Sequence, residues 1–217
     1  MGIGRLVVVG KPNLDQDEMY RRATHVAAEV IDGIRYVDNL EAALADFQYI
    51  VGTTARLGGA RGPVVSPREM AEKVSGISQE NRVALLFGPE DAGLTNDELR
   101  FCHLVVNIPT AEFKSLNLSH AVMILCYEIF SCRLSTEGRF VSKLASSQEL
   151  EGMYGQVAEL LVRIGFLNSQ NPEYWMMHIR RLLSRTGLHS KEVKIIRGIC
   201  RQMDWFLESR GKEDKKT

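Results

Sequence analysis

The stretch 83–130 constrains the fold more than any other part of the sequence. It reads VALLFGPEDAGLTNDELRFCHLVVNIPTAEFKSLNLSHAVMILCYEIF. An apolar run, a glycine loop and a short helix are followed by a second apolar run, a polar loop and a long helix. This alternation predicts an α/β fold with a mostly parallel sheet. The loops at 87–94 and 107–119 then lie at the carboxyl ends of strands, where open α/β sheets bind their ligands.

The same alternation extends toward the N-terminus. The pattern predicts strands at 5–10, 33–38, 48–55, 83–87 and 103–109. It predicts helices at 16–30, over 39–47 with Asp38 as the cap, and at about 116–133. Capping boxes begin two further helices, one at Ser66 with Glu69 and one at Thr95 with Glu98. The run 5–10 is nearly all apolar, which predicts a strand that is covered on both faces.

The character of the sequence changes after residue 134. Residues 135–148 show little periodicity and are predicted to be a linker. Helices are then expected at 149–164, from Asn171-Pro172 onward, and from a Ser190 cap to about 208. The sequence therefore predicts an α/β domain at 1–134, a linker at 135–148 and a helical extension at 149–217.

A net charge of zero hides an asymmetry along the chain. Residues 176–217 hold 11 Lys and Arg against 5 Asp and Glu, a net of +6, so the rest of the chain carries −6. On the last helix the basic residues fall within about one third of the circumference, and Val193, Ile196, Ile199, Met203 and Phe206 supply much of the opposing apolar surface. Such a surface can bind a phosphate backbone; a solvated helix face or domain packing are the alternatives. The candidate RNA-binding residues are Arg180, Arg181, Arg185, Lys191, Lys194, Arg197 and Arg201.

Several classes of protein are disfavoured. The four cysteines form no CxxC pair, which indicates reduced thiols in a cytoplasmic protein. No apolar run reaches the roughly 18 residues of a membrane span. The sequence has no GxxxxGK[ST] loop, and its histidines lack the spacing of metal ligands, so neither a nucleotide triphosphatase nor a metal site is expected.

Taken alone, each of the two loops is a weak signal. Gly88 and Gly93 bracket two acidic residues, and glycine permits close backbone approach to a ligand, but a tight turn explains the pattern equally well. Ser115 and Asn117 precede the long helix, where a simple N-cap is the alternative to a ligand contact.

In combination, the two loops resemble the second and third motifs of the SPOUT RNA methyltransferases. The matching segments are VALLFGPEDAGLTNDEL and VVNIPTAEFKSLNLSHAVMILCYE. The similarity is to the TrmH-like (SpoU) branch, whose members methylate ribose 2′-hydroxyls of tRNA. YIVGTTAR at 49–56 and the terminal RRLLSR…SKEVKIIRGI are similar to a bacterial subgroup of that branch with a helical extension. The resemblance implies a parallel sheet with a C-terminal trefoil knot, a homodimer, S-adenosylmethionine as methyl donor, and a tRNA anticodon-loop ribose as acceptor.

The resemblance also implies roles for particular residues. The cofactor-binding set would be Thr53, Thr54, Ala55, Gly88, Ile108, Lys114, Ser115 and Leu116. Glu90 and Asn117 would support the loops. Arg56 and Ser115 would be the catalytic-site residues, as ligands of the RNA phosphate and the hydroxyl.

The chain departs from the family at its start. The first family motif, with an Asn and an Arg that assists proton removal, precedes a strand like RLVVVG, and it has no counterpart here. We therefore expect cofactor binding to survive, catalysis to be poor, and a sheet edge to be exposed. A non-catalytic or weakly active RNA-binding dimer, or a SPOUT methyltransferase of ribosomal RNA, are the alternatives.

Overall fold

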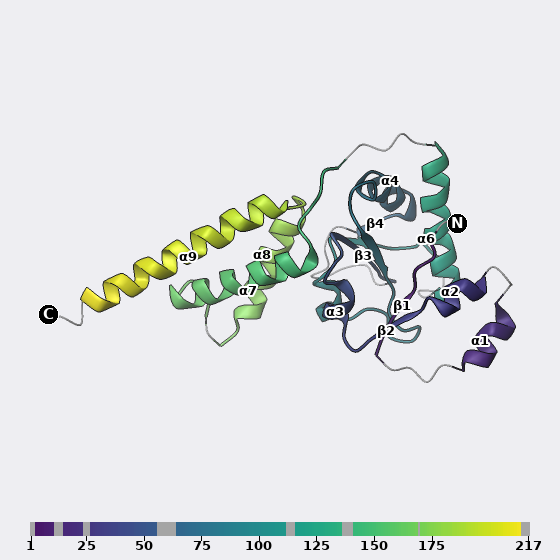
Figure 1. Cartoon of the computed structure of the whole chain (residues 1–217), viewed down its shortest axis with the longest axis horizontal. Coiled ribbons are helices and arrows are strands. Elements are labelled where there is room, and N and C mark those ends of the chain that lie inside the picture. The colour runs from purple at the N-terminus through teal and green to yellow at the C-terminus, as the bar shows by residue number, and fades with distance from the viewer. Residues whose placement is uncertain are drawn as a thin grey trace.

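The computed structural model describes residues 3–10, 15–23, 27–55, 64–111, 116–135, 141–168 and 170–213. A body of sheet and helices occupies one end of the molecule, and three helices extend away from it (Figure 1). Within the described part, no helix combines the length and apolar character that crossing a membrane requires.

A four-stranded parallel sheet organises the body. Its order is β4-β6-β3-β5, with β3 at Tyr49–Thr53, β4 at Val64–Val65, β5 at Val83–Leu86 and β6 at Leu104–Val106. Val51 of the central β3 pairs with Leu85 on one side and Leu104 on the other. The α/β class with a parallel sheet is thus confirmed. The two-residue β4 was not predicted from the sequence.

Alternating side chains of the sheet bury its two faces. Val51 and Leu104 belong to a core cluster with residues of α4 and α6 on one face. Ile50 lies on the other face with Leu44 of α3, and Val105 with Leu99 of α5. The helices are α3 (Leu40–Leu44), α4 (Pro67–Ile77), α5 (Asn96–Leu99) and α6 (Leu118–Ser135). Both predicted capping boxes, which begin α4 and α5, are present.

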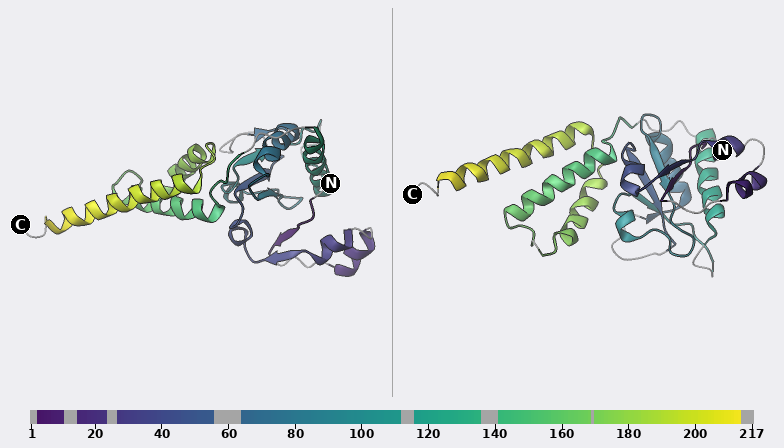
Figure 2. Two further views of the ribbon diagram at one scale, coloured as in Figure 1. Left: turned by 45° about the horizontal axis from the view of Figure 1, so that its top comes forward. Right: turned by 60° about the horizontal axis from the view of Figure 1, so that its bottom comes forward.

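The first 44 residues depart from three predictions, and the first concerns a separate two-stranded parallel sheet. It consists of β1 (Val7–Val9) and β2 (Arg35–Val37) and stands apart from the larger sheet (Figure 2). Val9 is 41% exposed, so the prediction of a strand covered on both faces was wrong: within the described residues, β1 pairs with β2 alone. The predicted helix over 16–30 is two helices, α1 (Gln16–Arg22) and α2 (Ala28–Asp32). The cap of α3 is Asn39 rather than Asp38, because the Asn39 side chain accepts a hydrogen bond from the Ala42 N–H.

Three helices form the extension. They are α7 (Ser147–Arg163), α8 (Pro172–Ser184) and α9 (Ser190–Glu213), and they share a buried cluster that includes Met153, Met176 and Val193. Gly165 follows α7 with a φ of +75°, which fits the predicted stop. Helix α9 begins at Ser190 itself, and the backbone N–H of His189 donates to the carboxylate of Glu192. The prediction that Ser190 caps this helix was therefore wrong, because Ser190 is its first helical residue.

The segment between the body and the extension is held in place. The Asn81 side chain donates to the carbonyls of Ile77, Val141 and Ser142, and its oxygen accepts from the Leu144 N–H at 2.7 Å. Farther along, the Ser147 N–H donates to the Phe47 carbonyl. Residues 141–146 of the predicted linker are irregular yet anchored to the body. The predicted bounds of 135–148 were too wide, because Ser135 ends α6 and Ser147 begins α7.

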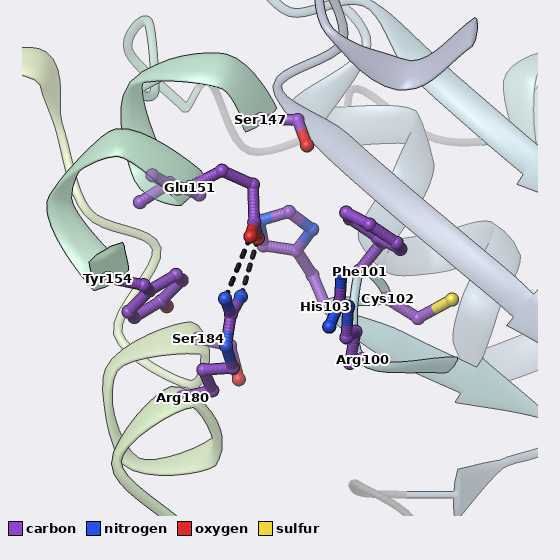
Figure 3. A pocket seen from close by; sticks show the side chains of 10 residues that line it. Arg100, Phe101, Cys102, His103, Ser147, Glu151, Tyr154, Arg180 and Ser184 are labelled. Carbon is purple, nitrogen blue, oxygen red and sulfur yellow. Dashed lines mark hydrogen bonds and ion pairs between the residues drawn. The ribbon is translucent and has the colours of Figure 1, made fainter. Parts of the chain in front are cut away.

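A small cavity lies where the extension meets the body (Figure 3). Its volume is about 20 Å³, enough for a water molecule. Beside it, the Arg180 guanidinium makes a bidentate ion pair with Glu151, with N–O distances of 2.5 and 2.8 Å, and lies over the Tyr154 ring. Both charged side chains are at most 17% exposed, so this pair is part of the packing.

Candidate functional site

Polar side chains and backbone groups join the carboxyl ends of three neighbouring strands. The Thr53 hydroxyl, at the end of β3, donates to the Leu86 carbonyl at the end of β5. The Thr54 N–H donates to the Val106 carbonyl of β6, and the Asn107 side chain donates back to the Thr54 carbonyl at 2.8 Å. The loops after β3, β5 and β6 therefore start from one connected edge. This is the place where a parallel sheet offers a ligand site.

The glycine loop after β5 is folded tightly on itself. A Cβ on Gly88 would lie 2.3 Å from the Gly93 carbonyl carbon and 2.4 Å from the Leu94 nitrogen. Gly93 has a φ of +66°, and its N–H donates to the Pro89 carbonyl. Both glycines are required by the loop's own backbone. The backbone of the loop is therefore closely packed between Gly88 and Leu94.

The glycine loop is also tied to the start of α6. The Glu90 carboxylate accepts a hydrogen bond from the Leu118 N–H at 3.2 Å, where the positive end of the helix dipole favours an anion. The Asn117 side chain accepts from the N–H and the hydroxyl of Ser119. Asn117 is therefore the N-cap of α6. The predicted supporting roles of Glu90 and Asn117 are consistent with these contacts.

The structure brings part of the predicted cofactor set together. Thr53, Thr54 and Gly88 lie on the connected edge, and Ala55 is exposed beside them. Ile108 packs against the core cluster of the sheet, so part of its side chain belongs to the core. Leu116 is half-buried just before α6. Arg56, Lys114 and Ser115 lie outside the described residues.

Two residues at this edge were missed by sequence reasoning. Asn107 is the amide that joins the β3 and β6 loops, and only its position after a strand hinted at a role. Gly52 is the next-to-last residue of β3, and a Cβ there would lie 2.6 Å from the Cys102 sulfur. A glycine within an apolar strand is a signal of close packing that the sequence did contain.

His103 is buried on the side of the body that faces the extension. Its Nδ1 accepts a hydrogen bond from the Ile50 N–H, and its ring stacks on Tyr49. Burial lowers the pKa of His103 to about 4, so the ring is neutral at physiological pH. In the described residues no three His, Cys, Asp or Glu side chains gather as metal ligands. His103 is therefore a packing residue.

The predicted RNA-binding residues divide into three groups. Lys191, Lys194, Arg197 and Arg201 are exposed on α9, and Arg197 donates to the Gln156 side chain. Arg181 is half-buried on α8, and Arg185 is the exposed C-cap of that helix. Arg180 is mostly buried against Glu151, which leaves its guanidinium no open face for RNA. The prediction for the other six residues stays a prediction.

The apolar surface predicted for α9 is only partly buried. Val193 is buried and Ile196 packs against the helical core. Ile199, Met203 and Phe206 are 41–56% exposed, because α7 covers only one face of α9 and they lie outside that face. Together with Ile195 they form an exposed apolar stripe along the helix.

Comparisons with known proteins agree with this architecture. The SpoU rRNA Methylase family model matches residues 1–127, and the model of the tRNA methyltransferase TrmJ C-terminal domain matches residues 148–216. The chain belongs to the SpoU methylase family.

Relatives with functional names cover most of the chain. It is 36% identical to "tRNA (cytidine/uridine/adenosine-2′-O-)-methyltransferase TrmJ" of Pseudomonas aeruginosa, over 92% of this chain and 82% of the relative. It is 35% identical to the tRNA (cytidine/uridine-2′-O-)-methyltransferase TrmJ of Salmonella typhimurium, over 94% and 86%. Among solved structures, TrmJ from Z. mobilis superposes with a TM-score of 0.78 at 27% identity, covering 94% of this chain and 88% of the other.

Proposed function

We propose that this protein transfers a methyl group from S-adenosylmethionine to a ribose 2′-hydroxyl in the anticodon loop of tRNA, acting as a homodimer. Membership of the SpoU methylase family and the names of the relatives support the reaction and the substrate. The observation that carries the proposal is the connected edge formed by the loops after β3, β5 and β6. Because hydrogen bonds join the starts of these three loops, the loops would form one ligand site together.

The residues at this edge suit the proposed cofactor. S-Adenosylmethionine supplies an electrophilic methyl group on a sulfonium sulfur. Its adenosine needs backbone hydrogen bonds and an apolar slot, as small-molecule sites commonly provide. The backbone of the loop that begins at Gly88 would supply the hydrogen bonds, and the side chains of Ile108 and Leu116 would supply apolar surface. Ala55 and the backbone near Thr54 would form a further wall, with Lys114 and Ser115 completing the site.

The chain's own residues must orient the ribose and its 2′-hydroxyl. The 2′-oxygen would form a bond to the methyl carbon while the carbon–sulfur bond of the donor breaks and S-adenosylhomocysteine leaves. The hydroxyl proton would pass to an RNA phosphate or to water, so this acceptor must be close. Positioning would provide much of the acceleration. We assign Arg56 and Ser115 to the RNA phosphate and the hydroxyl, respectively. This assignment rests on the resemblance described above.

Helix α6 supports the proposed dimer. It is apolar almost all round, and Leu118, Val122, Met123, Tyr127, Phe130 and Leu134 are each at least 37% exposed. A helix with this composition is normally buried on all sides. A second copy of the chain would cover the exposed face of α6. The same segment, from Asn107 into α6, would be the part of the chain that passes through the proposed trefoil knot.

The oligomeric state tests the dimer directly. Met123→Glu places a charge in the middle of the exposed face, and light scattering should then show a monomer. Ile195→Glu is the matched control, because Ile195 is also exposed but lies on α9. If the unsubstituted protein is already a monomer at micromolar concentration, the proposed dimer is wrong.

Methyl transfer is tested with S-adenosylmethionine carrying a labelled methyl group. The protein is incubated with unmodified tRNA or ribosomal RNA, and the RNA is digested to nucleosides. We expect label in a 2′-O-methylnucleoside from the anticodon loop of tRNA, and none when the acceptor ribose lacks its 2′-oxygen. Label in ribosomal RNA alone would show that ribosomal RNA, and not tRNA, is the substrate. Binding of tRNA without any transfer would instead identify a non-catalytic RNA-binding protein.

A further inference from the structure

Three aromatic rings gather on the outer side of α8. The Tyr174 ring meets the Trp175 and His178 rings with centroid distances of 5.8 and 5.2 Å, and the Trp175 and His178 rings are 6.1 Å apart. Tyr174 is 54% exposed, Trp175 is 52% exposed, and His178 is also exposed. We call these three residues the aromatic cluster.

The fold of the extension does not require this cluster. Helix α8 is held to its neighbours by its opposite side, where Met176 is buried and Ile179 and Leu183 pack against the helical core. None of the three rings belongs to that core. Contiguous exposed apolar groups of this type usually mark a binding surface.

Positive charge continues the same stripe of the helix. Tyr174, His178, Arg181 and Arg185 follow each other at intervals of four, three and four residues, which places them on one face. In the part of the chain that the structure describes, Arg181 and Arg185 form no ion pair. Arg180, on the inner side, is neutralised by Glu151. The outer stripe therefore combines stacked rings with cations that lack acidic partners.

We propose that the aromatic cluster stacks on an unpaired base of the RNA, while Arg181 and Arg185 bind the adjoining phosphates. This inference rests on the proposed function, because it takes RNA as the ligand. Single-stranded nucleic acids are bound in this way, since every base has a π-face and every linkage a negative charge. An apolar protein partner would explain the rings but not the two unpaired cations, so the charge favours RNA.

Tryptophan fluorescence tests the stacking directly. The sequence contains two tryptophans, Trp175 and Trp205. The Trp205→Phe variant leaves Trp175 as the reporter, and the Trp175→Phe variant leaves Trp205, which is 61% exposed, as the matched control. Each is titrated with a single-stranded oligouridine and with a blunt RNA duplex of the same number of phosphates. Binding is followed separately by the anisotropy of a dye on the RNA.

We expect the single strand, and not the duplex, to quench Trp175, with much weaker quenching of Trp205. RNA binding without quenching of Trp175 would overturn the stacking proposal and leave RNA binding intact. If no RNA, including whole tRNA, changes the anisotropy, both the stacking proposal and the proposed function are wrong. The two failures are therefore distinguishable.

A double substitution measures the contribution to affinity. Tyr174→Ala with Trp175→Ala should weaken binding of the single strand by roughly 5- to 100-fold, the range of alanine substitutions at stacking residues. Phe166→Ala is the control, because Phe166 is 65% exposed but lies outside the cluster. Circular dichroism should show unchanged helix content in both. Unchanged RNA affinity, with a change only in self-association, would assign the rings to protein contact and overturn the proposal.

Discussion

The loop edge of the sheet and the outer surface of the extension differ in the chemical groups that form them. At the loop edge the close contacts involve backbone groups, and Gly88, Asn107 and Glu90 matter because they fix where the backbone runs. The extension instead presents long side chains, with lysines and arginines on α9 and aromatic rings on α8. Small local changes should therefore damage the first region strongly, while the second should respond gradually to the removal of single groups.

The largest expected effect comes from removing the buried Arg180–Glu151 ion pair of the extension. Arg180→Met leaves the Glu151 carboxylate unpaired at a site where both side chains are at most 17% exposed. We expect a loss of about 3 kcal/mol in the free energy of unfolding, measured with urea. Adding Glu151→Met should restore most of the loss. Arg68→Met is the matched control, since the Arg68–Glu72 pair is well exposed and should contribute little.

Gly88→Ala tests the loop edge. The added Cβ would lie 2.3 Å from the backbone at Gly93, so the loop must move. A displacement of this kind should weaken S-adenosylmethionine binding by about 100-fold, as measured by calorimetry. Gly155→Ala on α7 is the control, because a Cβ there meets nothing within 4 Å. Equal cofactor affinity in both variants would contradict a site made by this loop.

The pH dependence of the free energy of unfolding tests the packing at the place where the body meets the extension. Because the pKa of His103 falls from 6.5 to about 4 on folding, the unfolded chain binds the proton first as pH decreases. The contribution of neutral His103 to the free energy of unfolding is therefore fully present above pH 6.5 and is lost as the pH falls toward 4. Between pH 7.5 and 5 the loss should be about 2 kcal/mol, and His103→Asn should remove that component. An identical acid-side slope in the variant would contradict this account.

The smallest expected effect concerns the α9 cations. Lys191→Gln with Lys194→Gln should lower the slope of log affinity for tRNA against log salt by about 1 to 2, with only a modest loss of affinity at low salt. Lys73→Gln on α4 is the control, since Lys73 is exposed but far along the chain from the extension. A slope that does not change would place the phosphate contacts elsewhere.

The sequence predicted the regular elements where local chemistry decides them. The capping boxes at Ser66 and Thr95 and the apolar strands β3, β5 and β6 were correct for this reason. The convergence of three loops was also predictable, because parallel strands bring their carboxyl ends to one edge. By contrast, the two-residue β4 is too short to show alternation, and it takes its register from β6.

What the sequence could not supply were distances between remote segments. Nothing local indicated that Glu90 would accept from Leu118, or that Arg180 would turn inward to Glu151 while Arg181 stays outward. The exposure of Val9 was also hidden, because apolar composition predicts burial and cannot show which strand edges find partners. The same limit applies to the aromatic cluster, whose rings are compatible with a core helix until the packing of α8 is known.

The anchoring of residues 141–144 by Asn81 has a consequence for catalysis. A freely jointed extension would hold bound RNA at the low effective concentration of a flexible tether. The anchored junction would instead confine RNA bound by the extension to a narrow range of positions relative to the loop edge. Binding of RNA by the extension would then place one nucleotide near the proposed cofactor site. Asn81 would thereby help to select the target nucleotide. Its hydrogen bonds would fix the distance between the loop edge and the RNA segment that the helices bind.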